Sequence, residues 1–246
     1  MAQTLRVATY NTELDRRGPG LLLRDILRND DAQITAVTDV IATVAPDILL
    51  IQRFDYDYDQ RALVAFADLL RQKGVDYPYL FARQPNSGIS TGIDMDGDGR
   101  LGRARDAQGY GQFAGQRGMA LLSRYPIAEG ARDFSTMLWR DLPGALLPTR
   151  NGAPFPSPEA QAVQRLSSVA HWEVPVLLPG GGLLRLLAWH ATPPVFDGPE
   201  DMNGRRNHDE AAFWQLYLEG KLDVLPPDGP FLLLGDANLD PIDGNG

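Results

Sequence analysis

The chain has 246 residues, 43% of them hydrophobic and 22% charged, with a formal net charge of −9. These values are ordinary for one globular α/β domain. The negative charge argues against a broad basic surface for nucleic acid, and the absence of cysteine excludes disulfides and thiolate metal sites. No apolar run approaches the ~18 residues of a membrane span. The first residues lead directly into a strand pattern and show no signal peptide, and a leader that has been removed stays an alternative.

Hydrophobic patterning predicts alternating strands and helices in the first half of the chain. LRVATY, residues 5–10, is typical of a strand, and the apolar run ILLI at 48–51 indicates a second, buried one. Apolar residues at helical spacing predict helices over 31–44 and 61–73. The run GMALLS at 118–123 predicts a third strand.

The second half is predicted to be richer in loops. Its expected parts are a Gly/Asp-rich ordered loop at 87–116, a proline-rich excursion at 141–158, a hairpin of 167–178 with 183–190, a helix at 207–219 and a last strand from 231. We find no internal repeat, low-complexity segment or linker, so the elements predict a single domain.

The last strand carries the most informative motif, FLLLGDANLDP at 231–241. A short apolar run that ends in Gly-Asp-Ala-Asn indicates a buried strand with polar groups at its C-terminal edge. Asp236 and Asn238 are two residues apart, so both point to one side if the extended conformation persists. The alternative is a simple turn in which Asp and Asn bond their own backbone.

Three other strands release a polar residue at the same end. These residues are Asn11, the pair Gln52-Arg53, and His190. Strand ends of this kind are where sites assemble in α/β sheets. A carboxylate, carboxamides and an imidazole brought together there suit a site that activates water and orients a phosphate.

Five segments in this order resemble the endonuclease/exonuclease/phosphatase superfamily: RVATYNTE, PDILLIQRFDYD, GMALLSRYPI, LLAWHATPP and LLLGDANLDP. Its members are similar to pancreatic-type deoxyribonuclease, neutral sphingomyelinase and inositol-polyphosphate 5-phosphatase. The resemblance spans essentially the whole chain. It implies a four-layer α/β sandwich with two central mixed sheets flanked by helices, and phosphoester hydrolysis helped by Mg²⁺ or Mn²⁺.

The resemblance also implies roles for individual residues. Asn11 would help to hold metal or phosphate, and His190 would contact the scissile phosphate. Asp236 would orient or deprotonate the attacking water, with Asn238 as its partner at the phosphate.

Two departures from the family pattern stand out. Arg53 occupies the position of the family's metal-binding glutamate, and a guanidinium cannot ligate a cation. Asp55, Asp57 and Asp59 follow it and offer either replacement carboxylates and partners for Arg53 or a polar loop and helix cap. The family's final Asp-His pair is absent before Gly246, so we expect the C-terminal strands of the domain to be missing.

A second cation site is predicted in DMDGDGR. Asp94, Asp96 and Asp98 have the spacing that begins a calcium loop, but the twelfth position is Arg105, with Asp106 one residue later. The segment is therefore either a structural Ca²⁺ site or a solvated Gly/Asp loop.

The helix that follows His190 begins with basic residues. Arg206 and His208, and less so Arg205, are candidates for contact with a substrate phosphate at the helix start; the alternative is a capped, surface-charged turn. For His171 we expect a structural role. Trp139, Trp189 and Trp214 are expected in the core.

These observations predict a metal-dependent phosphoester hydrolase, with nucleic acid, lipid and small-molecule substrates all open. A monomeric, extracytoplasmic bacterial enzyme is favoured over a DNA-repair enzyme, because the acidic chain lacks an evident Lys/Arg stripe. The main alternative is a non-catalytic relative that acts as a binding module, which Arg53 favours. A calcium-stabilised surface domain is a third possibility.

Overall fold

Two four-stranded sheets form the centre of the molecule. The computed structural model describes residues 4–240. The first sheet has the order β1-β2-β4-β3 and the second the order β10-β9-β8-β5. Their bounds are β1 Val7–Asn11, β2 Ile48–Phe54, β3 Tyr79–Phe81, β4 Gly118–Ser123, β5 Arg132–Asp133, β8 Ala170–Leu177, β9 Leu183–His190 and β10 Phe231–Asp236. A separate ribbon joins β6 Thr149–Arg150 to β7 Ala153–Pro154.

Both sheets are mixed. The parallel pairs are β1 with β2 and β10 with β9. The antiparallel pairs are β2 with β4, β3 with β4, β8 with β9 and β5 with β8. Each sheet therefore contains one parallel pair whose strands end at the same edge.

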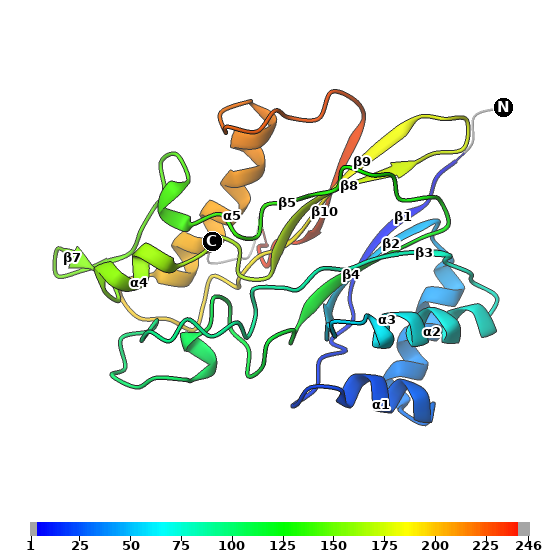
Figure 1. The fold of residues 1–246 in the computed structure, drawn as a ribbon, viewed down its shortest axis with the longest axis horizontal. Helices are drawn as coiled ribbons and strands as arrows, with labels where there is room; N and C mark the ends of the chain where they lie inside the picture. The colour runs from blue at the N-terminus through cyan, green and yellow to red at the C-terminus, as the bar shows by residue number, and fades with distance from the viewer. Residues whose placement is uncertain (1–3, 241–246) are drawn as a thin grey trace.

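Helices cover the outer faces of the sheets (Figure 1). They are α1 Leu21–Arg28, α2 Ala32–Val44, α3 Arg61–Gln72, α4 Pro158–Val163 and α5 Met202–Leu218, with short 3-10 turns η1 Ala104–Asp106 and η2 Trp139–Asp141. Helices α1 to α3 lie on one side of the sheet pair, and α5 lies on the other.

The alternation of side chains along β2 shows how the layers are held together. Leu49 and Ile51 face outwards into a core shared with α1 to α3. Ile48 and Leu50 face inwards and pack against the second sheet, including Trp172 of β8. On the far side, β9 packs against the aromatic residues of α5. The predicted four-layer sandwich is confirmed.

Most element predictions hold, with shifts at the ends. Asp31 caps α2 by accepting a hydrogen bond from the backbone of Ile34, as the predicted start implies. Helix α1 was not predicted, because Gly18-Pro19-Gly20 was interpreted only as a break. Helix α5 starts at Met202 rather than 207. Its first turns carry buried polar residues that do not give an amphipathic pattern.

Candidate functional site

The C-terminal ends of β1, β9 and β10 place three predicted residues beside one another. The parallel register pairs Asp236 with His190, and Asn11 Nδ2 donates a hydrogen bond of 2.8 Å to Asp236 Oδ2. Residues that are 225 positions apart thus meet where the two sheets approach each other. Asn11, His190 and Asp236, which we call the strand-end residues, thus lie together, whereas Gln52 and Arg53 have other partners.

Asp236 is held from two sides. Its Oδ2 accepts from Asn11, and its Oδ1 accepts the backbone N–H of Asn238 at 2.9 Å. The preceding Gly235 is required by close packing, since an added Cβ would meet the carbonyl oxygen of Trp189 at 2.0 Å. The Asp236 side chain remains 26% exposed, so it is oriented and still accessible to a water or substrate.

Asn238 adopts the left-handed conformation with φ 51°. Its Nδ2 donates to the carbonyl oxygen of Ala191 at 2.8 Å and so ties the end of β10 to the end of β9. The bond from the Asn238 backbone N–H to Asp236 Oδ1 is a local Asx turn, as in the alternative prediction, whereas the bond to Ala191 is long-range. The Asn238 side-chain oxygen has no role in either contact.

His190 is buried and uncharged near neutral pH. Burial lowers its pKa to about 4; the Asp236 carboxylate opposes this shift, while the positive charges of Arg53 and Arg117 add to it. Within residues 4–240, its buried Nδ1 has no hydrogen-bond partner. Its Nε2 lies 3.9 Å from Asp236 Oδ2, too far for a direct hydrogen bond, so one water can bridge the two groups.

Arg53 lies at a bulge in β2 and points to the loop after β1. Its Nε donates to Asp15 Oδ1 at 2.9 Å, and its NH1 contacts Glu13 Oε1 at 2.6 Å. The expected pairing with Asp55 or Asp57 does not occur. Those two carboxylates instead accept backbone N–H groups, and Asp57 caps α3 at Arg61 N and Ala62 N.

Asp55 nevertheless shapes the site. Its two oxygens accept the backbone N–H groups of Arg16 and Arg117 at 2.8 and 3.1 Å. Burial raises the pKa of Asp55 to about 6, against the lowering effect of these two hydrogen bonds. It links three segments that the sequence keeps apart.

At the start of α5, Arg206 is buried and bonded to backbone carbonyl groups. Arg206 is 5% exposed, and its guanidinium donates to the carbonyl oxygens of Leu166, Gln108, Arg165 and Ser167. Its donors hold loops together, so we assign it a structural role in place of substrate contact.

The described partner of His208 is its neighbour Asp209. His208 is an exposed residue whose Nδ1 lies 2.9 Å from Asp209 Oδ1, and its side chain has 64% of its surface exposed. No described contact joins it to Asn11, His190 or Asp236 within residues 4–240. Its contact with a substrate therefore stays a prediction. Arg205, the weaker candidate, has its Nε buried without a partner in the same range.

The aspartate loop differs from the predicted set in one member. Among residues 4–240, Asp94, Asp96 and Asp106 form the one group of three acidic or histidine side chains whose ligand atoms lie within 4.8 Å of one another. Asp98 instead accepts the backbone N–H of Arg100. Burial raises the pKa of Asp94, but hydrogen bonds from Gly99, Gly97 and Asp96 outweigh it and the net pKa is lowered.

His171 has the structural role expected of it. Its Nε2 lies 3.0 Å from the carbonyl oxygen of Glu210, which can only accept, so Nε2 carries the proton. Its Nδ1 then accepts from Ser167 Oγ at 2.8 Å. Trp139 and Trp189 lie in the core with Trp214, as predicted.

Sequence reasoning missed Asp15 and Arg117. Asp15 Oδ2 receives Arg117 Nε at 3.1 Å, while Asp15 Oδ1 receives Arg53. The available signal was position: Asp15 follows the first strand by four residues, and Arg117 directly precedes the strand GMALLS. Neither residue is part of a motif by itself.

The donors at the strand ends do not fit a divalent cation. Asn11 and Asp236 bond each other, and both oxygens of Asp15 are occupied by guanidinium groups. A guanidinium ~4 Å from a divalent ion would be repelled by about 8 kcal/mol at an effective dielectric of ~20. Among the described residues, the carboxylates that lie close together are those of Asp94, Asp96 and Asp106 in the separate aspartate loop, and both oxygens of Asp106 accept backbone N–H groups.

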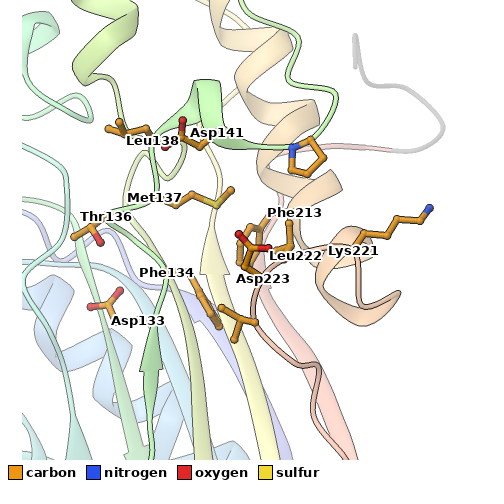
Figure 2. A pocket seen from close by; sticks show the side chains of 12 residues that line it. Asp133, Phe134, Thr136, Met137, Leu138, Asp141, Phe213, Lys221, Leu222 and Asp223 are labelled. Atoms are coloured by element: carbon orange, nitrogen blue, oxygen red, sulfur yellow. The ribbon is translucent and has the colours of Figure 1, made fainter.

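A surface cavity of about 440 Å³ lies away from these residues (Figure 2). It is lined by the end of β5, the segment that follows β5, and α5 with the loop after it. Phe134, Met137 and Phe213 supply its apolar wall, while Asp133 and Lys221 supply charge. None of the strand-end residues lines it. We therefore do not place the reaction there.

The fold is a two-sheet α/β sandwich with polar side chains gathered at the ends of three strands. The chain belongs to the Endonuclease/Exonuclease/phosphatase family, whose model matches residues 8–246. The structure of a family protein from Beutenbergia cavernae DSM 12333 is similar, with 19% identity and a TM-score of 0.52, over 96% of this chain and 47% of that one. The chain thus spans about half the length of that relative. A comparison with curated proteins gives no match.

Two further solved structures are similar at lower TM-scores. Sphingomyelinase C from Streptomyces griseocarneus has 18% identity and a TM-score of 0.49, over 97% of this chain and 66% of that one. D. rerio TDP2 complexed with a single-strand DNA product has 14% identity and a TM-score of 0.43, over 96% and 61%. In the part of the chain that the structure describes, no helix has the length and apolar character to cross a membrane.

Proposed function

We propose that the protein hydrolyses a phosphoester at the end of β1, β9 and β10. The observation that carries this proposal is the hydrogen-bonded contact between Asn11 and Asp236 beside His190. The family supports it, since its enzymes are in general phosphoesterases that use divalent metal ions. A relative by fold does not fix the substrate, which the loops around a site decide.

In this proposal Asp236 is the general base. A water bonded to its carboxylate gives up a proton to it while the water oxygen forms a bond to phosphorus. The ester P–O bond breaks, and the leaving oxygen takes up a proton from solvent. Asn11 fixes the carboxylate through its amide N–H, and the neutral His190 donates its single N–H to a phosphate oxygen.

Metal dependence is a separate part of the proposal. The family's usual cofactor is Mg²⁺ or Mn²⁺, but the described strand-end donors are not arranged for one, so no step above passes through it. We propose Ca²⁺ as a structural ion at Asp94, Asp96 and Asp106, whose carboxylates suit a hard cation. Changes at the strand-end site should alter turnover, whereas changes at the calcium site should alter stability.

The test is hydrolysis of bis-p-nitrophenyl phosphate, p-nitrophenyl phosphate and plasmid DNA, with Mg²⁺, Mn²⁺ or Ca²⁺ and then with chelator. Asp236→Asn or His190→Ala should lower turnover by ~10² or more, because each removes acid-base or electrostatic stabilisation. Arg71→Gln, on the exposed surface of α3, is the control and should retain full activity. Near-normal turnover in both site variants, with intact folding, would refute the assignment.

A binding module without catalysis is the second candidate function. The observation that favours it is Arg53, which occupies the position of the family's metal-binding glutamate and pairs with Asp15. This function predicts phosphate binding with no turnover under any of the metal conditions above. A bacterial, extracytoplasmic location and a monomeric state remain predictions, measured by fractionation and sedimentation.

A further inference from the structure

Arg53, in β2, and Arg117, which directly precedes β4, both have a left-handed backbone conformation. Arg53 has φ 53° and Arg117 has φ 59°, a left-handed region that side chains other than glycine and asparagine rarely adopt. Both lie at the same end of the β2–β4 pair, where Phe54 is opposite Gly118 and the register shifts. Strained non-glycine residues gather at functional sites, where the surrounding structure holds them.

Asp15 holds the two guanidinium groups together. Its Oδ1 lies 2.8 Å from Arg53 NH2, and its Oδ2 lies 3.1 Å from Arg117 Nε. The Asp15 side chain is 11% exposed, and the guanidinium carbon of Arg117 lies 5.1 Å from the ring centre of Tyr110. One carboxylate and one ring thus orient two cations in a fixed pair.

The pair keeps donors available. Within residues 4–240, the hydrogen bonds of Arg117 use its Nε and its backbone N–H, which leaves both terminal nitrogens for a ligand. Arg53 NH1 contacts Glu13, whose side chain is 65% exposed. An exposed ion pair of this kind contributes little and is readily exchanged for another anion.

The pair adjoins the strand-end residues. Arg53 directly follows Gln52, which is in register with Asn11, and Asn11 bonds Asp236. Both guanidinium charges also act on the buried His190. Asp15 joins Arg117 to Arg53, so the two cations lie together at the end of β2, next to the strand that carries Asn11.

We propose that Arg53 and Arg117 together bind the non-bridging oxygens of the phosphoryl group, at the place where the family fold would otherwise use a cation. The proposal rests on the proposed function of the same site for its catalytic part. Guanidinium groups present parallel N–H donors that match phosphate oxygens, and they supply positive charge without a metal ion. Glu13 gives way when the phosphate arrives, and Asp15 keeps the two cations oriented.

The first measurement is binding of inorganic phosphate by calorimetry in the presence of chelator. Arg53→Gln and Arg117→Gln should each weaken binding at least tenfold, and Arg117→Lys should weaken it as well, because an ammonium loses the paired donors. Arg71→Gln should bind as the parent does. Melting curves of each variant establish that it is folded, and Arg117→Lys retains the charge if Arg117→Gln fails to fold.

The second measurement is the chelator sensitivity of turnover, and it separates this inference from the proposed function. Turnover that persists in chelator and falls in both arginine variants supports both. Turnover that requires Mg²⁺ or Mn²⁺, with no phosphate binding in chelator, retains the function and overturns the inference. Arginine-dependent phosphate binding without turnover in any metal retains the inference and overturns the function. Equal phosphate binding by parent and variants overturns the inference.

Discussion

Two buried histidines, His171 and His190, are uncharged in different surroundings. His190 has a carboxylate near its Nε2, whereas His171 is fixed by a hydroxyl and a carbonyl oxygen among aromatic rings of α5. Burial lowers the pKa of each to about 4 from an ordinary value of 6.5. The folded protein therefore resists protonation at both positions, while the unfolded chain does not.

This difference predicts acid sensitivity. Because the folded pKa of His171 is depressed, its contribution to stability is fully present above pH 6.5 and is lost as pH falls towards 4. The loss is about 3 kcal/mol, from 1.36 kcal/mol per pKa unit. His171→Asn should flatten the fall in unfolding free energy over that range, measured by urea denaturation at a series of pH values. An unchanged slope would show that His171 is already charged or that it titrates normally.

Asp55 has the opposite effect on how stability changes with pH. Its folded pKa of about 6 exceeds the ordinary 3.8, so the folded state takes up this proton first and gains stability as pH falls from 6 to 3.8. The slope difference between parent and His171→Asn is therefore the quantity to compare, because the Asp55 contribution is common to both.

Some residues of the site could be predicted from the sequence and others could not. Asn11, His190 and Asp236 were predictable because each ends an apolar run, and strand ends converge. The burial of Arg206 was not, because its partners are carbonyl oxygens of distant loops. The salt bridge of Arg53 to Asp15 depends on a bulge that no local pattern specifies.

At the scale of elements, long periodic segments were predicted well and irregular ones were not. Helices α2 and α3 carry apolar stripes, so their limits agree within a residue or two. Helix α5 buries polar groups such as Asn207 and Glu210, which bond strand-end backbone, so periodicity did not show its first turns. Contacts with distant residues therefore determine where this helix begins. Contacts of the same kind bring Asp106, rather than Asp98, beside Asp94 and Asp96.

The aspartate loop makes a prediction at this scale. Ca²⁺ should raise the melting temperature of the protein, since an ion that binds only the folded state stabilises it. Asp106→Asn should abolish that shift, because Asp106 joins Asp94 and Asp96, whereas Asp98→Asn should largely retain it. The measurement is a thermal melt with Ca²⁺ and with chelator. Loss of the shift in Asp98→Asn with an unchanged shift in Asp106→Asn would favour the set of Asp94, Asp96 and Asp98 instead.

For the whole molecule, the resemblance of five ordered motifs implied the layered sandwich. The structure agrees with it, since strands with apolar residues on both faces are covered on both faces. Strand β10 is the exception to this cover. Phe231, Leu232 and Leu233 are 43%, 41% and 47% exposed, and among the described strands β10 pairs with β9 alone. An edge strand with large exposed apolar side chains is a surface that associates with other apolar molecules or chains.

This edge predicts binding of an apolar dye such as ANS to the folded protein. Leu233→Lys should reduce the fluorescence gain at least twofold, because a charge at the edge disrupts the apolar surface. Leu27→Lys, at an exposed leucine on α1 that is 65% accessible, is the matched control and should leave it unchanged. Equal dye binding by the parent and Leu233→Lys would place the dye site elsewhere.

The hydrogen bond between Asn11 and Asp236 has a consequence for the order of folding. It joins residues near the two ends of the described chain, whereas α2 and α3 form from local contacts. Loop closure over such a separation is slow compared with helix formation, so the two parallel strand pairs must both be in register before the cluster exists. In a refolding reaction the helical signal should therefore return first, and phosphate binding at the strand ends should report the last step of assembly.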